Sequence, residues 1–230
     1  MSETFVLSLG GSIVAPDKPD TSFLAAFAEQ LRLEVAEAGH RFVLVVGGGG
    51  PARAYQSAYR ELVGEPDKDE QDWIGIAATR LNAQLIRGLF HDLCPQPVVI
   101  DPSEVESFDG SILVAAGWKP GWSTDYDAVI LAERFGADTV INLSNIDQVY
   151  DADPKKYPSA KPLKRVSWGE FRKIVGDEWS PGSNFPFDPI ASSRAASLGL
   201  RVIAAGGRDL VNLKAILREE SFLGTQIGPE

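Results

Sequence analysis

The chain has almost none of the side chains that build disulfide-bonded or zinc-binding domains. Its 230 residues include one cysteine, Cys94, and two histidines, His40 and His91. A single cysteine excludes an intrachain disulfide, and these three side chains are too few for a structural zinc site with four Cys or His ligands. We expect Cys94 to fill apolar space in the core.

Long apolar runs and excess positive charge are also missing. No stretch approaches the roughly 20 apolar residues that span a bilayer, and the opening MSETFVLSLGG lacks the basic and apolar regions of a secretory signal. The formal net charge is −10 and the isoelectric point is about 4.8, which disfavours non-specific binding to nucleic acid or to an anionic membrane. We therefore expect a soluble cytoplasmic protein that binds small molecules.

The residues that are present have the composition and rhythm of an α/β domain. Hydrophobic residues make up 44% of the chain, enough for one full core. Strand patterns are predicted at 4–9, 42–46, 98–100, 112–116, 139–143 and 200–204, and helices at 21–38, 51–63, 69–90, 124–135, 168–175, 189–198 and 209–218. Residues 150–167 are predicted to form a hairpin or an excursion, and 178–187 an irregular loop. The alternation predicts a three-layer αβα sandwich around a mostly parallel sheet.

The most informative stretch is FVLVVGGGGPARAY, residues 42–55. Its apolar run predicts a strand buried on both faces, and Pro51 suits the first turn of a helix. Between them, glycines 47–50 let bare N–H groups approach an anion at the helix N-terminus, and Arg53 adds a cation. The alternative is a tight turn without a ligand. Because four consecutive glycines are conformationally costly, we favour a phosphate-binding loop.

Two further glycine-bearing junctions follow predicted strands. One is Gly10-Gly11-Ser12, and the other lies within GWKPGWSTD, residues 117–125. Ligands of open parallel sheets bind beyond the carboxyl ends of the strands. Three such junctions on one edge are expected to hold a chain of phosphates between them.

Six segments, taken in order, resemble the amino-acid-kinase superfamily. They are LSLGGS (7–12), VVGGGGPARAY (45–55), DWIGIAATRLNA (72–83), KPGWSTD (119–125), SNIDQVYDADP (144–154) and FDPIA (187–191). The chain is most similar to the uridylate kinases, the archaeal-type branch in particular, over nearly its whole length. SNIDQVYDADP is the most specific segment, because no general α/β turn requires it.

The resemblance implies a carbamate-kinase-like fold and one domain over residues 1–230. Residues 1–135 would form roughly the acceptor-binding part, and 136–230 the ATP-binding part. The implied reaction is phosphorylation of UMP by ATP, a step of pyrimidine nucleotide synthesis, with Mg²⁺ carried by ATP rather than held in a protein metal site. The implied assembly is a homo-hexamer, built as a trimer of dimers.

On the donor side, the resemblance assigns ATP-binding roles to Gly11, Ser12, Gly49, Arg53, Ser144, Asn145, Tyr150 and Asp153. Backbone N–H groups of the two glycine loops would meet the phosphates, and Tyr150 would offer an aromatic face near adenine. The alternative for Asp153, which precedes Pro154, is a turn.

On the acceptor side, the implied UMP-binding residues are Gly48, Asp72, Trp118, Lys119, Pro120, Gly121, Trp122, Ser123 and Thr124. Asp72 would accept hydrogen bonds from the ribose hydroxyls, since a carboxylate is an acceptor and a diol supplies two donors. The alternative for Asp72 is a favourable place near a helix N-terminus. Ser123 and Thr124 would hold the phosphate, cap the following helix, or do both.

The catalytic candidates are Arg53, Lys18 and Asp188. Asp188 matches an aspartate near the transferring phosphoryl group, although a helix N-cap explains it equally well. Many family members carry a lysine where this chain has Ser8. The positive charge would then come from Lys18, Arg53, Lys119 or the Lys155-Lys156 pair, together with Mg²⁺.

Gln148 and the two tryptophans of the acceptor loop depart from the family pattern. Gln148 replaces a usual glycine. Trp118 and Trp122 would stack on a base, fill the space that a base needs, or pack the loop or a subunit contact. These departures keep two alternatives open: a kinase for another small acceptor, and a non-catalytic nucleotide- or oxoanion-binding protein of the molybdenum-storage type.

Overall fold

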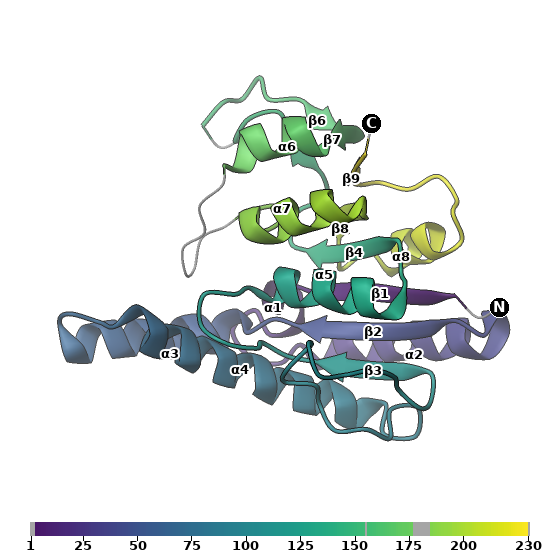
Figure 1. The fold of residues 1–230 in the computed structure, drawn as a ribbon, viewed down its shortest axis with the longest axis horizontal. Helices are drawn as coiled ribbons and strands as arrows, with labels where there is room; N and C mark the ends of the chain where they lie inside the picture. Colours follow the sequence, from purple (N-terminus) through teal and green to yellow (C-terminus); the bar gives the residue numbers. More distant parts are fainter. Residues whose placement is uncertain (1–2, 155, 177–184, 230) are drawn as a thin grey trace.

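The computed structural model describes residues 3–154, 156–176 and 185–229. Its centre is a seven-stranded sheet with the strand order β3-β2-β1-β4-β8-β9-β7 (Figure 1). The strands β3 (Ile112–Ala115), β2 (Arg41–Val46), β1 (Thr4–Leu9), β4 (Thr139–Ser144) and β8 (Arg201–Gly206) are all parallel. The prediction of a mostly parallel sheet is therefore confirmed.

The far edge of the sheet was not predicted. β9 (Thr225–Gly228) pairs antiparallel with β8, and β7 (Arg165–Ser167) pairs parallel with β9. Both strands are too short to show a hydrophobic period. The expected hairpin is present as β5 (Val149–Tyr150) and β6 (Pro162–Leu163). The strand predicted at 98–100 is wrong, because only Val99 makes an isolated bridge, to Ala115.

Helices cover both faces of the sheet, as predicted. α2 (Thr21–Ala38), α4 (Lys68–Leu89) and α8 (Leu210–Leu217) share one core cluster with the sheet, and α5 (Thr124–Phe135), α6 (Trp168–Val175) and α7 (Pro189–Leu198) share the other. Figure 1 shows α5 and α7 over one face and α2 over the opposite one. Two further helices, α1 (Gly11–Val14) and α3 (Gly49–Val63), begin at the glycine loops.

The period-two alternation of the strands decides which side chains meet which helical layer. Leu7 and Leu44 pack into the cluster with α2, whereas Val6 and Val43 pack into the cluster with α5. Cys94 is buried in the first cluster as a free thiol, as expected for an apolar filler.

Local capping sets the helix ends. Asp20 accepts a hydrogen bond from the Phe23 N–H at the start of α2, and Gly39 ends that helix in the left-handed region with φ 68°. Within the described residues, no helix is long and apolar enough to cross a membrane.

The carboxyl ends of the five parallel strands meet at one edge of the sheet. All three predicted glycine junctions lie there, after the adjacent strands β1, β2 and β3. The hairpin of α3 and α4 projects past this edge (Figure 1). The fold thus brings together the segments that the sequence analysis singles out.

Candidate functional site

The first two glycine loops pack against each other through bare backbone. A Cβ on Gly11 would lie 2.0 Å from the Gly49 nitrogen, and a Cβ on Gly50 would lie 2.2 Å from the Pro16 carbonyl oxygen. Gly49 also has φ 65°, and its Cβ would lie 2.3 Å from the carbonyl oxygens of Ala15 and Gly11. Close packing of the two loops therefore requires glycine at these positions. The phosphate-binding hypothesis did not predict this requirement.

The N-terminus of α3 lies in this packed region. Its N-cap residue, Gly48, has no side-chain capping hydrogen bond. In the first turn Pro51 has no N–H and the Gly50 N–H donates to the Ala15 carbonyl at 2.8 Å, so the Gly49 N–H is the first-turn donor that could meet an anion. Arg53 is exposed, and its Nη2 donates to the Pro16 carbonyl at 2.8 Å. Lys18 is exposed on the same 15–20 loop.

Helix α4 holds the second and third glycine junctions in place. Asn82 Nδ2 donates to the carbonyl oxygens of Gly47 and Gly48, at 2.9 and 3.0 Å. The Gly117 N–H donates to Thr79 Oγ1 at 2.9 Å, and Arg80 Nη2 donates to the Trp118 carbonyl at 3.0 Å. Sequence reasoning did not assign roles to Thr79, Arg80 or Asn82, although all three lie within the DWIGIAATRLNA segment.

Asp72 connects the same helix to the acceptor loop. The Gly121 N–H donates to Asp72 Oδ2 at 2.9 Å. Burial raises the pKa of the half-buried Asp72, and the hydrogen bond from Gly121 opposes the rise. Helix α4 itself begins at Lys68 with Asp67 as its cap, so Asp72 is not needed to start the helix. The structure therefore brings together Asp72 and the 118–124 loop.

The acceptor loop is stabilised by its own aromatic side chains. Trp118 and Trp122 stack with ring centroids 6.3 Å apart, and Trp122 lies 4.0 Å from the Tyr126 ring. Lys119 Nζ lies 3.8 Å from the Trp118 centroid, at cation–π distance. Among the interpretations left open for the tryptophans, packing of the loop itself is observed. Pro120 lies in the same loop.

Ser123 and Thr124 lie where the acceptor loop meets α5. Ser123 is the N-cap residue, and its hydroxyl accepts from the Tyr126 N–H; Thr124 is the first residue of the helix. The capping function predicted for this pair is therefore observed.

Two neighbouring carboxyl groups, the half-buried Asp125 and the buried Asp188, lie at the starts of α5 and α7. Ser8 Oγ donates to Asp125 Oδ1 at 2.9 Å, and the Asp188 N–H donates to Asp125 Oδ2 at 3.1 Å. Burial, and then the Asp188 charge, raise the pKa of Asp125 to about 6. Asp188 caps α7 by accepting from the Ala191 N–H at 2.7 Å. Among the described residues, its Oδ2 has no hydrogen bond of normal geometry, and burial raises the pKa of Asp188.

Asp127, two residues after Asp125 in α5, is fully buried. Its Oδ2 accepts a hydrogen bond from the Trp118 N–H at 3.3 Å, and within the described residues its Oδ1 has no partner. Burial raises the pKa of Asp127 to about 8, so the carboxyl group is mostly protonated at neutral pH.

The raised pKa of Asp127 predicts a stability that falls as pH rises. Between the usual 3.8 and about 8, the folded state holds a proton that the unfolded state releases. The free energy of unfolding should therefore decrease across this window, by up to about 1.4 kcal/mol per pH unit. Asp127→Asn mimics the protonated acid and should flatten the decrease between about pH 6 and about pH 8. Chemical denaturation of both proteins across this range checks the prediction, and equal slopes would contradict it.

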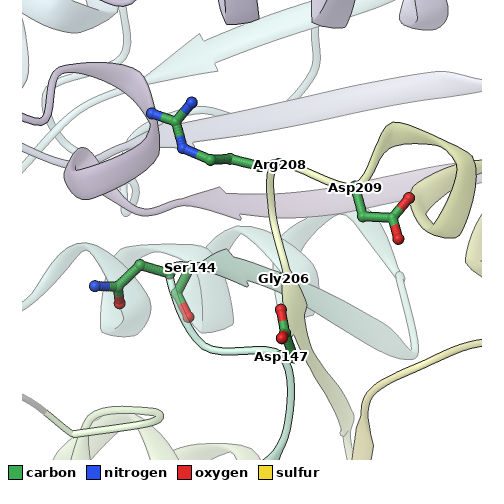
Figure 2. Close-up of a pocket in the computed structure, with 6 residues that line it drawn as sticks. Ser144, Asp147, Gly206, Arg208 and Asp209 are labelled. Atoms are coloured by element: carbon green, nitrogen blue, oxygen red, sulfur yellow. The ribbon is translucent and has the colours of Figure 1, made fainter.

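An open cleft lies beyond the ends of β4 and β8. Its volume is about 380 Å³, and it is lined by Ser144, Asn145, Asp147, Gly206, Arg208 and Asp209 (Figure 2). Ser144 and Asn145 were predicted site residues. Asp147, Arg208 and Asp209 were missed, although the sequence GGRD at 206–209, two residues beyond the end of the strand predicted at 200–204, resembles the other glycine junctions. A Cβ on Gly206 would lie 2.4 Å from Asp147 Oδ1, the end of an exposed side chain that can move aside.

The remaining donor-side predictions lie outside the lining of this cleft. Tyr150 is in β5, and Asp153 is in the exposed turn that follows. Gln148 Nε2 donates to the Gly224 carbonyl at 3.1 Å, which gives this departure from the family pattern a structural role beside β9. Lys156 is exposed, whereas Lys155 and residues 177–184 lie outside the described residues.

Comparisons with known proteins agree with this architecture. The model of the amino acid kinase family matches residues 3–204. The uridylate kinase of Methanospirillum hungatei is 38% identical, over 97% of this chain and 94% of that protein. The uridylate kinase of Hyperthermus butylicus is 37% identical, over 97% and 95%. The crystal structure of uridylate kinase from Archaeoglobus fulgidus superposes with a TM-score of 0.82 at 33% identity, covering 99% of this chain and 100% of that one.

Proposed function

The chain belongs to the amino acid kinase family, and we propose that it transfers the γ-phosphoryl group of ATP to UMP. The relatives that cover nearly its whole length are uridylate kinases. They do not favour the two alternatives, a kinase for another small acceptor and a molybdenum-storage type of binding protein.

The observation that carries the proposal is the way α4 joins the acceptor loop to the Gly47–Gly50 loop. Asp72 and Thr79 contact the acceptor loop, and Asn82 contacts the glycine loop. Phosphoryl transfer requires two nucleotides held in line, and little covalent chemistry from the protein. A single rigid helix that fixes both binding loops supplies this alignment.

We assign the two nucleotides to opposite sides of the Gly47–Gly50 loop. A Cβ on Gly49 would meet the β1–α1 loop, whereas Gly48 faces Thr79 of α4. ATP would bind on the side of Gly11, Ser12 and the Ser144–Asn145 cleft. UMP would bind on the side of Asp72 and the 118–124 loop, with its phosphate at the start of α5. We further propose that residues 1–230 form one domain with these two parts.

The residues near the transferred group suit a magnesium ion that is carried mainly by ATP. Mg²⁺ prefers oxygen ligands and commonly uses one or two carboxylates together with substrate phosphates. Asp188 presents a buried oxygen, Oδ2, that has no hydrogen bond of normal geometry within the described residues, although the nearby Ser123 hydroxyl lowers the pKa of the carboxyl group. Within the described residues, no group of three or more Asp, Glu, Cys or His side chains could hold a metal ion by itself. When bound, the ion supplies positive charge to the phosphate oxygens, and Asp188 with Asp125 would hold it.

The family resemblance also suggests a cytoplasmic homo-hexamer, built as a trimer of dimers. Large apolar side chains are exposed on the projecting α3 and α4 hairpin, where Tyr55, Leu62 and Leu81 are 71%, 85% and 70% exposed. Such a surface is typical of a contact between subunits. In the hexamer, these apolar side chains would be buried against a second copy of the chain.

The proposed activity is tested with the purified chain, ATP, Mg²⁺ and one nucleoside monophosphate at a time. A coupled assay follows formation of ADP. We expect ADP to form with UMP far faster than with CMP, AMP or GMP. Failure of every monophosphate to release ADP would refute the proposal.

A further inference from the structure

Arg208 is the only cation among the six residues that line the cleft at the ends of β4 and β8. It lies in the turn between β8 and α8, and its side chain is 52% exposed. Figure 2 shows this side chain extending away from Asp147 and Asp209, toward the N-terminal segment drawn in purple. The guanidinium therefore points away from the acidic side of the cleft.

Asp20 and the Phe23 ring hold the Arg208 guanidinium in this direction. Arg208 Nη1 donates to Asp20 Oδ2 at 2.9 Å, and the guanidinium carbon lies 5.7 Å from the centroid of the Phe23 ring. The Phe23 N–H, followed by Arg208, lowers the pKa of Asp20, so Asp20 stays ionised at neutral pH. The bond to Asp20 uses one of the five N–H donors of a guanidinium.

Asp20 also ties Arg208 to the phosphate-binding region. The 15–20 loop that ends at Asp20 packs on the second glycine loop, where the Gly50 N–H donates to the Ala15 carbonyl at 2.8 Å. The Asp20 N–H also donates to the Val14 carbonyl at the end of α1, the helix that begins at Gly11. The guanidinium therefore lies beside the segment that follows the first glycine loop and packs on the second. The phosphates of a nucleotide that runs from the Ser144–Asn145 cleft toward Gly11 and Gly49 would pass near it.

We propose that Arg208 binds the β- and γ-phosphates of the donor triphosphate, and that Asp20 positions it. This inference rests on the proposed function, because it concerns the donor of the same reaction. Guanidinium groups suit phosphate oxygens by geometry and charge. Two of the other candidate cations are engaged elsewhere: Arg53 bonds the Pro16 carbonyl and Lys119 lies on the Trp118 ring. Arg208 therefore supplies charge that Ser8, whose hydroxyl bonds Asp125, does not.

The proposal predicts a loss of affinity that depends on the number of phosphates. In Arg208→Gln, calorimetric titration should show ATP bound about 10- to 100-fold more weakly, the range of a lost charge-assisted hydrogen bond. ADP should lose less affinity than ATP, and AMP and UMP should bind as they do to the wild type. Arg208→Lys should recover part of the ATP affinity, because it keeps the charge without the planar fork.

Arg201→Gln is the matched control, because Arg201 forms a comparable exposed ion pair with Asp138 at the other end of β8. It should leave the affinity for ATP unchanged. Asp20→Asn should weaken ATP binding less than Arg208→Gln does, since the cation remains. Equal weakening of AMP and ATP in Arg208→Gln, or no weakening of either, would overturn the proposal. Arg208-dependent ATP binding by a chain that phosphorylates no monophosphate would refute the proposed function and leave this inference standing.

Discussion

Replacing Gly49 by alanine is expected to slow phosphoryl transfer by at least about 100-fold, the loss that follows from misplacing reacting groups by about 1 Å. The added Cβ would lie 2.3 Å from the carbonyl oxygens of Ala15 and Gly11. These are backbone atoms, so the two glycine loops must separate. Left-handed strain and overpacking together should also lower the free energy of unfolding by about 2–5 kcal/mol.

Gly136→Ala is the control for this prediction. Gly136 has φ 64°, nearly the same as Gly49, but a Cβ there would meet nothing within 4 Å. It ends α5 as an ordinary left-handed cap, so the substitution should cost about 1–2 kcal/mol of stability and leave turnover unchanged. Steady-state rates and denaturation curves of both variants provide the comparison. Equal losses of turnover in the two would show that the loop contact does not matter.

The second large effect is expected for Asp72→Asn. The variant keeps an oxygen that can accept from the Gly121 N–H but loses the charge that would face the ribose hydroxyls. We expect the KM for UMP to rise about 10- to 100-fold, as for loss of a charge-assisted hydrogen bond, while the KM for ATP stays constant.

Asp69→Asn is the matched control for Asp72, because it removes a carboxylate from the first turn of the same helix. Both substitutions weaken the interaction with the helix dipole. Of these two residues, Asp72 is the one that accepts a hydrogen bond from the acceptor loop. If both variants raised the KM for UMP equally, the dipole explanation for Asp72 would be correct and the assignment to the acceptor site would be wrong.

The sequence predicted best those features that depend on local pattern. Helix α2 has the predicted bounds, because Asp20 and Gly39 mark its ends and its apolar residues keep a helical period. The three glycine junctions meet at one edge, because parallel strands place their carboxyl ends together. The hydrogen bond from the Gly121 N–H to Asp72 joins two segments that the resemblance assigns to the acceptor, and the role of Asp72 toward the ribose stays a prediction.

Contacts between distant segments were beyond the sequence pattern. Arg208 pairs with Asp20 across 188 positions, and nothing in either local sequence indicates the other. β9 joins the sheet with four residues, too few for a hydrophobic period. Asp127 is one of two acids in the first turn of α5, and only the packed structure shows that it is enclosed.

The glycine loop at 47–50 changed most in interpretation. Its sequence predicted an anion cradle, and the structure shows that the same glycines allow the β1 and β2 loops to pack backbone against backbone. The two functions are compatible, because tightly packed loops hold their N–H groups in fixed positions. The rigidity of this pair is what we expect to align the two nucleotides.

The measurement that tests the central claim most directly follows the γ-phosphate of labelled ATP when UMP is present. If the chain holds the two nucleotides in line, the label should appear in UDP, in equal amount to the ADP formed, and without UMP little label should leave ATP. Label released as free phosphate, with no labelled UDP, would contradict the account.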